Sequence, residues 1–384
     1  MQPPNLCIST LWFLLSIISS AAGVGTSVVT AGACIHGGGV TSTVSLEQRR
    51  YLIRLPKLPA PCGMDGVMVL PLVVLIHCYG CEAWMEINKY AAAADRLQFV
   101  LVAPEGIERS FNSPSCCGAA RESNIDDVAF VESIVEDLFL AQSRPASGAH
   151  PLHGGHIHIS RQAIFAAGFS NGGFFVSHLA SMSHGVAWAG IAAAAGHEYT
   201  PRRTEALAVA MQHCVHDRHV SINGCCASNR CCCGIEAPNC VTTEAIFRRW
   251  VEVNRCSNGT RLVRPRTSGM TDARCWLGIG CEAETSLCLW GGQCTHPQWS
   301  HDFSGVADHV LESFGRTACR RHGGEAMPHE DSVSMVRVHE PNGVQGTASN
   351  LCRCGKGRSG PYCLRDRRIH GGIRAGARRR RARG

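Results

Sequence analysis

The sequence predicts an α/β protein, in which a mostly parallel sheet is flanked by helices and a small disulfide-rich module is appended. Apolar, β-branched segments alternate with helical patterns through the middle of the chain. A serine flanked by glycines stands where one such strand meets a helix. The 384-residue chain also holds 23 cysteines, which indicates disulfides and an oxidising compartment.

The segment 71–78, PLVVLIHC, is a continuous apolar run, as expected of a strand covered on both faces. The segment 126–140 places apolar residues on one face at helical spacing, with Asp126 and Asp127 in the first turn, where the helix dipole favours acids. A second helix is expected from about Gly172. The other predicted strands are 49–56, 99–104, 163–169, 188–196, 206–213 and 286–290.

Residues 1–22 have the apolar stretch and small terminal residues of a signal peptide, although no Lys or Arg precedes the stretch. Cleavage after Ala22 would remove Cys7 and leave 22 cysteines, an even number. We therefore expect a secreted, extracellular protein with no membrane span after cleavage. An uncleaved signal anchor is the alternative.

The net charge of +7 comes from one end of the chain. Residues 365–384 hold nine Arg and one Asp, so the rest of the chain is close to neutral. We expect this tail to be disordered and able to contact an anionic surface. Nucleic-acid binding is disfavoured, because the tail has no interleaved aromatic residues and the chain carries secretion signals.

Gly168-Phe169-Ser170-Asn171-Gly172 fits the pattern G-x-S-x-G, after an apolar strand and before a helix. This is the setting of a nucleophile elbow, where a sharp turn exposes the serine oxygen at a helix N-terminus. The sequence therefore predicts Ser170 as a nucleophile. An ordinary glycine-rich turn is the alternative.

A serine nucleophile requires a base and an acid that orients the base. In α/β hydrolases these follow in the order Ser, Asp or Glu, His. Asp217 follows the predicted strand 206–213, and His296 follows the predicted strand 286–290, with His301 as the second choice of base. Backbone N–H groups of Cys78 or Tyr79, after strand 71–78, and of Asn171 would form the oxyanion hole. This chemistry needs no cofactor or metal.

These motifs resemble the secreted esterase family of α/β-hydrolase fold that contains polyhydroxybutyrate depolymerases, feruloyl esterases and acetylxylan esterases. The resemblance covers about residues 45–315. It is carried by LIHCYGC (75–81), by SPSCCGAARESNIDDVAFV (113–131), by RQAIFAAGFSNGG (161–173) and by HCVHDRHV (213–220). It implies a Ser-His-Asp triad that hydrolyses feruloyl, acetyl or hydroxyalkanoate esters in extracellular polymers or polysaccharide side chains.

The sequence departs from the family pattern in three places. Cys78 and Cys214 replace glycines that follow a histidine, which extra disulfides would explain. Gln293 aligns with the base position in one alignment of the last loop, and Gln cannot accept a proton near neutral pH. The alternative function is therefore a catalytically inactive, hydrolase-fold binding or adhesion protein.

Residues 319–363 resemble a degenerate EGF-like module, with C-x-C-x8-C over 352–363 and Cys319 in a C-x-x-x-G-G stretch. The resemblance implies disulfides Cys319–Cys352 and Cys354–Cys363. Such modules serve as spacers or protein-binding units.

Two further clusters contain residue types that bind metals. The histidines at 150, 153, 156 and 158 have no fixed ligand spacing and favour a polar loop. The cysteines at 225, 226, 231, 232 and 233 favour disulfides, each with a different partner, because adjacent cysteines seldom pair with each other.

Overall fold

The computed structural model describes most of the region between residues 39 and 323. The described residues are 39–58, 68–145, 150–155, 157–198, 204–226, 231, 233, 240–263, 273–292, 294–296, 304–323, 325–326 and 352–353. The expected signal peptide, the Arg-rich tail and most of the expected EGF-like module lie outside them.

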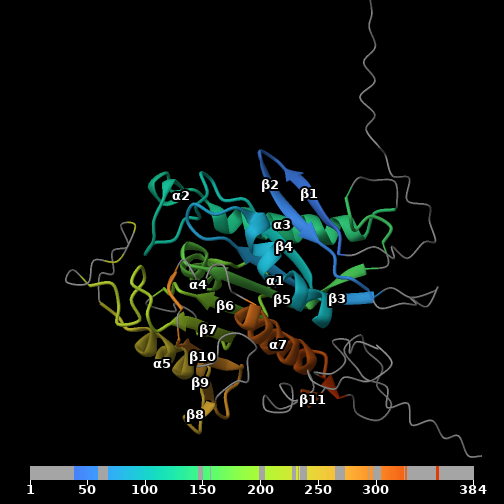
Figure 1. Cartoon of the computed structure of the whole chain (residues 1–384). Coiled ribbons are helices and arrows are strands. Elements are labelled where there is room, and N and C mark those ends of the chain that lie inside the picture. The colour runs from blue at the N-terminus through green and yellow to red at the C-terminus, as the bar shows by residue number, and fades with distance from the viewer. Residues whose placement is uncertain are drawn as a thin grey trace, which may run out of the picture. The chain divides into compact units, whose positions relative to one another are not determined.

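A ten-stranded sheet runs through the described body, in the order β1-β2-β4-β3-β5-β6-β7-β10-β9-β8 (Figure 1). The strands from β4 to β10 in this order pair in parallel, while β1, β2, β9 and β8 pair antiparallel at the two edges. Their bounds are β1 Thr41–Leu46, β2 Arg49–Arg54, β3 Met68–Ile76, β4 Val100–Pro104, β5 Ile157–Phe169, β6 Gly190–Ala194, β7 Ala208–Cys214, β8 Thr260–Val263, β9 Ala273–Gly278 and β10 Thr285–Trp290.

Helices cover both faces of this sheet. Their bounds are α1 Ala83–Leu97, α2 Ala119–Glu122, α3 Asp127–Gln142, α4 Asn171–Met182, α5 Thr243–Val253 and α7 Ser304–Arg321. Alternate residues of β3 enter the two cores. Val73 and Leu75 pack with α1 and α7 on one face, whereas Val74 and Ile76 pack with α3, α4 and α5 on the other. The continuous apolar run of β3 is thus explained by burial on both sides.

The predicted fold class, an α/β-hydrolase, is confirmed. The strands expected from the sequence are all present, and helix α3 begins where Asp126 accepts a hydrogen bond from the N–H of Ala129 at 2.9 Å. Helices α1, α5 and α7 and the edge strands β1, β8 and β9 were not predicted from the sequence.

The described body extends beyond residues 45–315 at both ends. The body already includes β1 from Thr41, before the expected start at residue 45. Helix α7 continues to Arg321, and Cys319, close to its end, is fully buried in the core. Cys319 therefore packs in the core of the α/β body, and the expected module remains a prediction. Beyond it, β11 (Glu325–Ala326) pairs with β12 (Cys352–Arg353), and the expected disulfides of Cys319, Cys352, Cys354 and Cys363 remain predictions.

Disulfides join cysteines throughout the body. Cys78 and Cys214, which stand where the resembled esterases have glycines, are bonded as Cys78–Cys81 and Cys214–Cys294. In the cysteine-dense insertion, Cys225 and Cys226 take different partners, as expected. Cys116 and Cys117 are joined to each other, although adjacent cysteines seldom pair. The further described pairs are Cys256–Cys281 and Cys275–Cys288.

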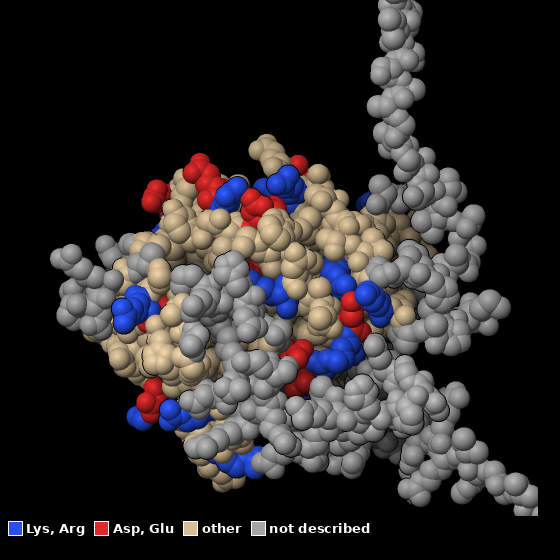
Figure 2. Space-filling view, in the orientation of Figure 1, with Lys and Arg blue, Asp and Glu red and all other residues tan. Residues whose placement is uncertain are grey.

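Basic and acidic side chains are interspersed over the described surface seen in Figure 2, without a large patch of one sign. This agrees with the nearly neutral body deduced from the sequence. Among the described helices, none is both long enough and apolar enough to cross a membrane.

Candidate active site

Ser170 forms the sharp turn between β5 and α4. Its φ of 56° and ψ of −118° lie in a region that non-glycine residues rarely adopt. The turn is held by two backbone hydrogen bonds, from Ser170 N–H to Ala194 O at 2.8 Å and from Phe174 N–H to Ser170 O at 3.0 Å. The chain therefore maintains a strained backbone at the residue that the sequence identifies as the nucleophile.

The glycines of the elbow are required by close main-chain contacts. A Cβ atom at Gly168 would lie 2.2 Å from the carbonyl oxygen of Gly172, and a Cβ atom at Gly172 would lie 2.1 Å from that of Ile76. Because the obstructing atoms are backbone, no side-chain movement could make room. This explains the G-x-S-x-G spacing.

The structure brings Ser170, His296 and Asp217 together. His296 Nε2 lies 3.0 Å from Ser170 Oγ, and His296 Nδ1 lies 2.7 Å from Asp217 Oδ2. The imidazole of His296 also packs against the rings of Phe169 and His219, with centroids 4.9 Å and 5.1 Å away. These are the contacts by which a histidine could take the serine proton while a carboxylate orients its ring.

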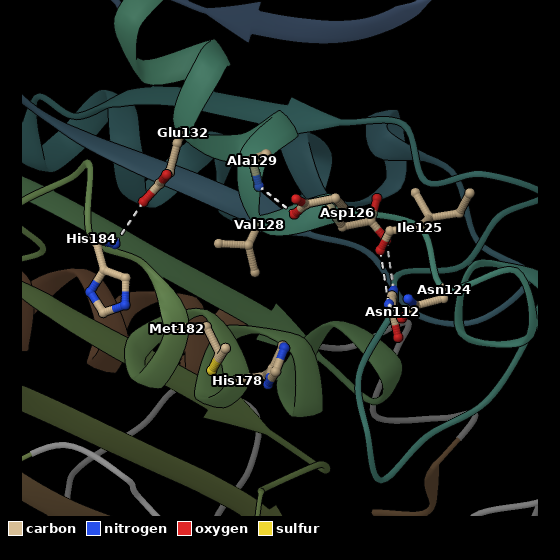
Figure 3. Close-up of a pocket in the computed structure, with 11 residues that line it drawn as sticks. Asn112, Asn124, Ile125, Asp126, Val128, Ala129, Glu132, His178, Met182 and His184 are labelled. Atoms are coloured by element: carbon tan, nitrogen blue, oxygen red, sulfur yellow. Dashed lines mark hydrogen bonds between the residues drawn. The ribbon is translucent and has the colours of Figure 1, made fainter.

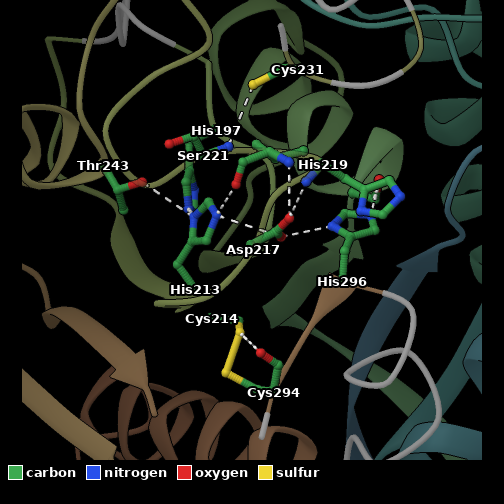
Figure 4. Close-up of polar contacts among 12 residues, drawn as sticks. His197, His213, Cys214, Asp217, His219, Ser221, Cys231, Thr243, Cys294 and His296 are labelled. Atoms are coloured by element: carbon green, nitrogen blue, oxygen red, sulfur yellow. Dashed lines mark hydrogen bonds and ion pairs between the residues drawn. A yellow bond between two sulfur atoms is a disulfide. The ribbon is translucent and has the colours of Figure 1, made fainter. Parts of the chain in front are cut away.

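Asp217 is held as a carboxylate by its surroundings. Its Oδ1 atom accepts hydrogen bonds from the N–H groups of His219 and Val220, both at 2.9 Å (Figure 4). Burial alone would raise the pKa of Asp217, but the bond from His296, the neighbouring imidazoles and the Val220 N–H lower it below its ordinary value. The buried acid is therefore charged at neutral pH.

A second imidazole, His213, lies on the other side of the Asp217 carboxylate from His296 (Figure 4). Its Nε2 atom donates to Val220 O at 2.9 Å and lies 3.8 Å from Asp217 Oδ2. Its Nδ1 atom lies 3.2 Å from both Thr243 Oγ1 and His197 Nε2. Burial lowers the pKa of His213, so the ring is neutral and fixed as a donor to Val220.

The loop expected to hold the oxyanion follows β3. His77 Nδ1 donates to Cys78 O at 2.8 Å, and His77 Nε2 accepts from Gly106 N–H at 3.0 Å. Burial lowers the pKa of His77 to about 4, which keeps this arrangement neutral. In the described part of the chain, no hydrogen bond uses the backbone N–H of Cys78, Tyr79 or Asn171. The oxyanion-hole donors therefore remain predictions.

The side chain of Asn171 has a role that was not predicted from the sequence. Its Oδ1 accepts from Phe111 N–H at 2.8 Å, and its Nδ2 donates to Phe111 O at 3.0 Å. Asn171 and Phe111 are both fully buried, so these bonds join the elbow to the 105–118 loop. The sequence pointed only to the backbone of Asn171, since nothing in it shows which loop an amide will meet.

His301, the second choice of base, and Gln293, which occupies the base position in one alignment, lie outside the described residues. His296 is therefore the imidazole that the described structure places against Ser170.

No protein-family model matches this sequence, and no curated protein matches it. Solved structures match parts of this chain at low identity. The poly(3-hydroxybutyrate) depolymerase LpqC from Bordetella parapertussis is 14% identical, covers 78% of this chain and 94% of its own, and has a TM-score of 0.40. Esterase PE8 is 15% identical, with coverages of 64% and 95% and a TM-score of 0.38. The S-formylglutathione hydrolase from Agrobacterium tumefaciens is 10% identical, with coverages of 74% and 97% and a TM-score of 0.39. Because similarity at this level does not identify a reaction, the function must follow from the site itself.

A cavity of about 420 Å³ lies between α3 and α4, and no triad residue lines it. Figure 3 shows that its wall includes Asp126, Glu132, His178 and His184. Asp126 caps α3, and Glu132 accepts hydrogen bonds from the N–H groups of His184 and Gly185 at 2.9 and 2.8 Å. Both carboxylates thus already stabilise the walls of the cavity.

Among the described residues, Cys275, Cys288 and His309 could approach one metal ion. Cys275 and Cys288 are bonded to each other, and a disulfide offers no thiolate ligand. His309 Nε2 lies 3.2 Å from Cys288 Sγ and packs against this bond.

Proposed function

We propose that this protein is a secreted serine carboxylesterase that uses a Ser170-His296-Asp217 triad. The observation that supports this most strongly is the continuous pair of contacts from Ser170 Oγ through the two nitrogens of His296 to Asp217 Oδ2. The strained elbow at Ser170 supports it independently, because such strain persists where function requires it.

In the first half-reaction, Ser170 Oγ attacks the ester carbonyl carbon while His296 Nε2 accepts the serine proton. The new C–O bond gives a tetrahedral intermediate with a negative oxygen, and Asp217 stabilises the imidazolium. Collapse breaks the bond to the alcohol oxygen, which takes the proton from His296 and leaves. The acyl group remains on Ser170.

In the second half-reaction, His296 accepts a proton from water, whose oxygen attacks the acyl carbon. The resulting intermediate collapses to a carboxylic acid, and His296 returns the proton to Ser170 Oγ. In both halves, the backbone N–H groups of Asn171 and of Cys78 or Tyr79 stabilise the oxyanion. Losing one such donor typically costs a factor of about 10² to 10³ in kcat. No cofactor takes part.

The proposed substrates are ester-bearing extracellular polymers or polysaccharides, with feruloyl, acetyl or hydroxyalkanoate groups. The motifs at 75–81, 113–131, 161–173 and 213–220 support this class through their resemblance to the secreted esterases. The signal-like N-terminus and the many cysteines support secretion. The Arg-rich tail would hold the enzyme near an anionic surface.

The test is labelling with a fluorophosphonate, which reacts with an activated serine. We expect the folded wild-type protein to be labelled and to hydrolyse p-nitrophenyl acetate. We expect Ser170→Ala to abolish labelling and to lower kcat by at least about 10³-fold. Ser181→Ala, on the same helix, is the control and should keep wild-type activity.

A folded wild-type protein that is neither labelled nor active would contradict the enzyme and favour the alternative, an inactive hydrolase-fold binding protein. If activity is present, comparing acetyl, feruloyl and 3-hydroxybutyryl esters will identify the acyl group. Sequencing the mature N-terminus tests secretion, since cleavage after Ala22 predicts a start at Gly23.

A further inference from the structure

The disulfide between Cys214 and Cys294 joins the two loops that carry the proposed acid and base. Cys214 is the last residue of β7, three residues before Asp217. Cys294 follows β10 and stands two residues before His296. The bond thus connects residues that are 80 positions apart in the sequence.

Main-chain hydrogen bonds hold the turn after β7 that carries Asp217, the proposed acid. Cys214 lies opposite Trp290 in the parallel pairing of β7 with β10, and Val215 N–H donates to Trp290 O at 2.9 Å. Asp217 N–H then donates to Cys214 O at 3.2 Å, which forms the turn that carries the carboxylate. The position of Asp217 is therefore tied directly to the backbone of Cys214.

The segment that carries His296, the proposed base, begins after the pairing of β10 with β7 has ended. The pairing of β10 with β7 stops at Trp290, four residues before Cys294. Cys214 and Cys294 are 0% and 5% exposed, so the bond between them is inside the protein, directly below Asp217 and His296 (Figure 4). The disulfide thus attaches the segment after β10 to the end of β7, at a point two residues before His296.

We propose that the Cys214–Cys294 disulfide is a positioning device, which holds His296 Nδ1 against Asp217 and thereby supports turnover by the triad. This inference rests on the proposed esterase function. Positioning of this kind is energetically important, because misplacing a reacting group by about 1 Å can cost about 10² in rate.

The other described disulfides do not share this geometry. Cys256–Cys281 closes a loop beside the edge strands β8 and β9, next to the exposed pair of Arg255 and Glu282. It therefore provides a matched control, since removing it deletes a cross-link from the same body but not from between the acid and the base.

The test is a double-mutant cycle on the full-length protein. We expect Cys214→Ala/Cys294→Ala to lower kcat for p-nitrophenyl acetate about 10-fold to 100-fold with a smaller change in KM. The rate of fluorophosphonate labelling should fall by a similar factor. Cys256→Ala/Cys281→Ala should retain kcat within about twofold. All assays are run well below the melting temperature of each variant, which is measured by circular dichroism.

Removing the disulfide from an Asp217→Ala protein distinguishes positioning of His296 from general stabilisation of the fold. If the disulfide acts by aligning His296 with Asp217, its removal should have little further effect on the residual kcat of Asp217→Ala. An equal loss in both backgrounds would overturn the proposal, as would unchanged kcat in the cysteine variant. An inactive, unlabelled wild-type protein would instead contradict the proposed function.

If the double variant does not fold, graded reduction of the wild-type protein replaces it. Dithiothreitol reduces a disulfide to two thiols and is itself oxidised to a cyclic disulfide. Alkylation with iodoacetamide and mass spectrometry then give the fraction of each pair opened. We expect activity to fall in proportion to opening of Cys214–Cys294. Loss of activity that follows another pair would overturn the proposal.

Discussion

His213 Nε2 lies 3.8 Å from Asp217 Oδ2, and the same nitrogen donates to Val220 O at 2.9 Å. His213 therefore fixes the turn whose N–H groups at His219 and Val220 hold the other oxygen of Asp217. We expect His213→Ala to lower kcat about 10-fold, equivalent to about 1.4 kcal/mol in the barrier, because this turn loosens. His213→Gln can still present an N–H to Val220 O and should retain more activity.

The measurement is kcat for p-nitrophenyl acetate in both His213 variants, together with their melting temperatures. A control is His216→Ala, since His216 is exposed on the same loop. Equal activity of His213→Ala and His213→Gln would show that the donated hydrogen bond is unimportant.

Gly172→Ala should prevent correct formation of the elbow. The added Cβ atom would lie 2.1 Å from Ile76 O and 2.8 Å from His77 O, both of which belong to the main chain. We expect the free energy of unfolding to fall by at least about 3 kcal/mol, or the protein not to fold. At Gly155 an added Cβ atom would lie 3.4 Å from its nearest neighbour, so Gly155→Ala should change stability within about 0.5 kcal/mol. Denaturant unfolding followed by tryptophan fluorescence measures both, and a stable Gly172→Ala protein would contradict the steric argument.

Asn171→Ala should reduce both stability and turnover, because it removes the partners of the buried N–H and C=O groups of Phe111. We expect a loss of about 2–6 kcal/mol, from about 1–3 kcal/mol for each of the two unsatisfied groups. We also expect kcat to fall, because these bonds no longer hold the elbow, which carries Ser170, against the 105–118 loop. Asn112→Ala, in the same loop but less buried, is the control. Wild-type melting temperature and kcat in Asn171→Ala would disprove this role.

Glu284 should make the protein sensitive to acid. Burial alone would raise its pKa, but Arg316 and Arg320, at 2.7 and 2.9 Å, lower the pKa of Glu284 to about 2 from an ordinary 4.5. The unfolded chain therefore binds this proton more readily than the folded protein does. The stability that the group contributes, of order 3 kcal/mol, is present above about pH 4.5 and is lost as pH falls towards 2.

Glu284→Gln should remove this part of the pH dependence. It should also destabilise the protein at neutral pH by about 3–5 kcal/mol, because the buried Arg316 loses the carboxylate that lies 2.7 Å from its guanidinium. Glu282→Gln, which disrupts only the exposed pair with Arg255, is the control and should leave the acid dependence unchanged. The free energy of unfolding, measured from pH 7 to pH 2, tests the prediction. An unaltered slope in Glu284→Gln would contradict it.

The order of strands and helices around the site could be predicted from the sequence because it depends on local pattern. The apolar run of β3, the acidic first turn of α3 and the glycines around Ser170 each reflect constraints imposed by neighbouring residues in the chain. Helix α7 was missed because its buried apolar positions, such as Leu311, Phe314 and Ala318, are interspersed with charged and polar residues, several of which are buried as well. For the same reason, the sequence did not show that α7 continues through residue 319.

The sequence by itself determined which residue types could form a triad and in what order they follow the strands. Which imidazole meets Ser170, how Asn171 joins the 105–118 loop, and which cysteine lies beside which were decided only by the tertiary structure. Asp217 and His296 are 79 residues apart, and they meet because β7 and β10 are adjacent and parallel, so that their carboxyl ends lie together. Adjacency of strands depends on the packing of the whole sheet, and no local pattern in the chain encodes it.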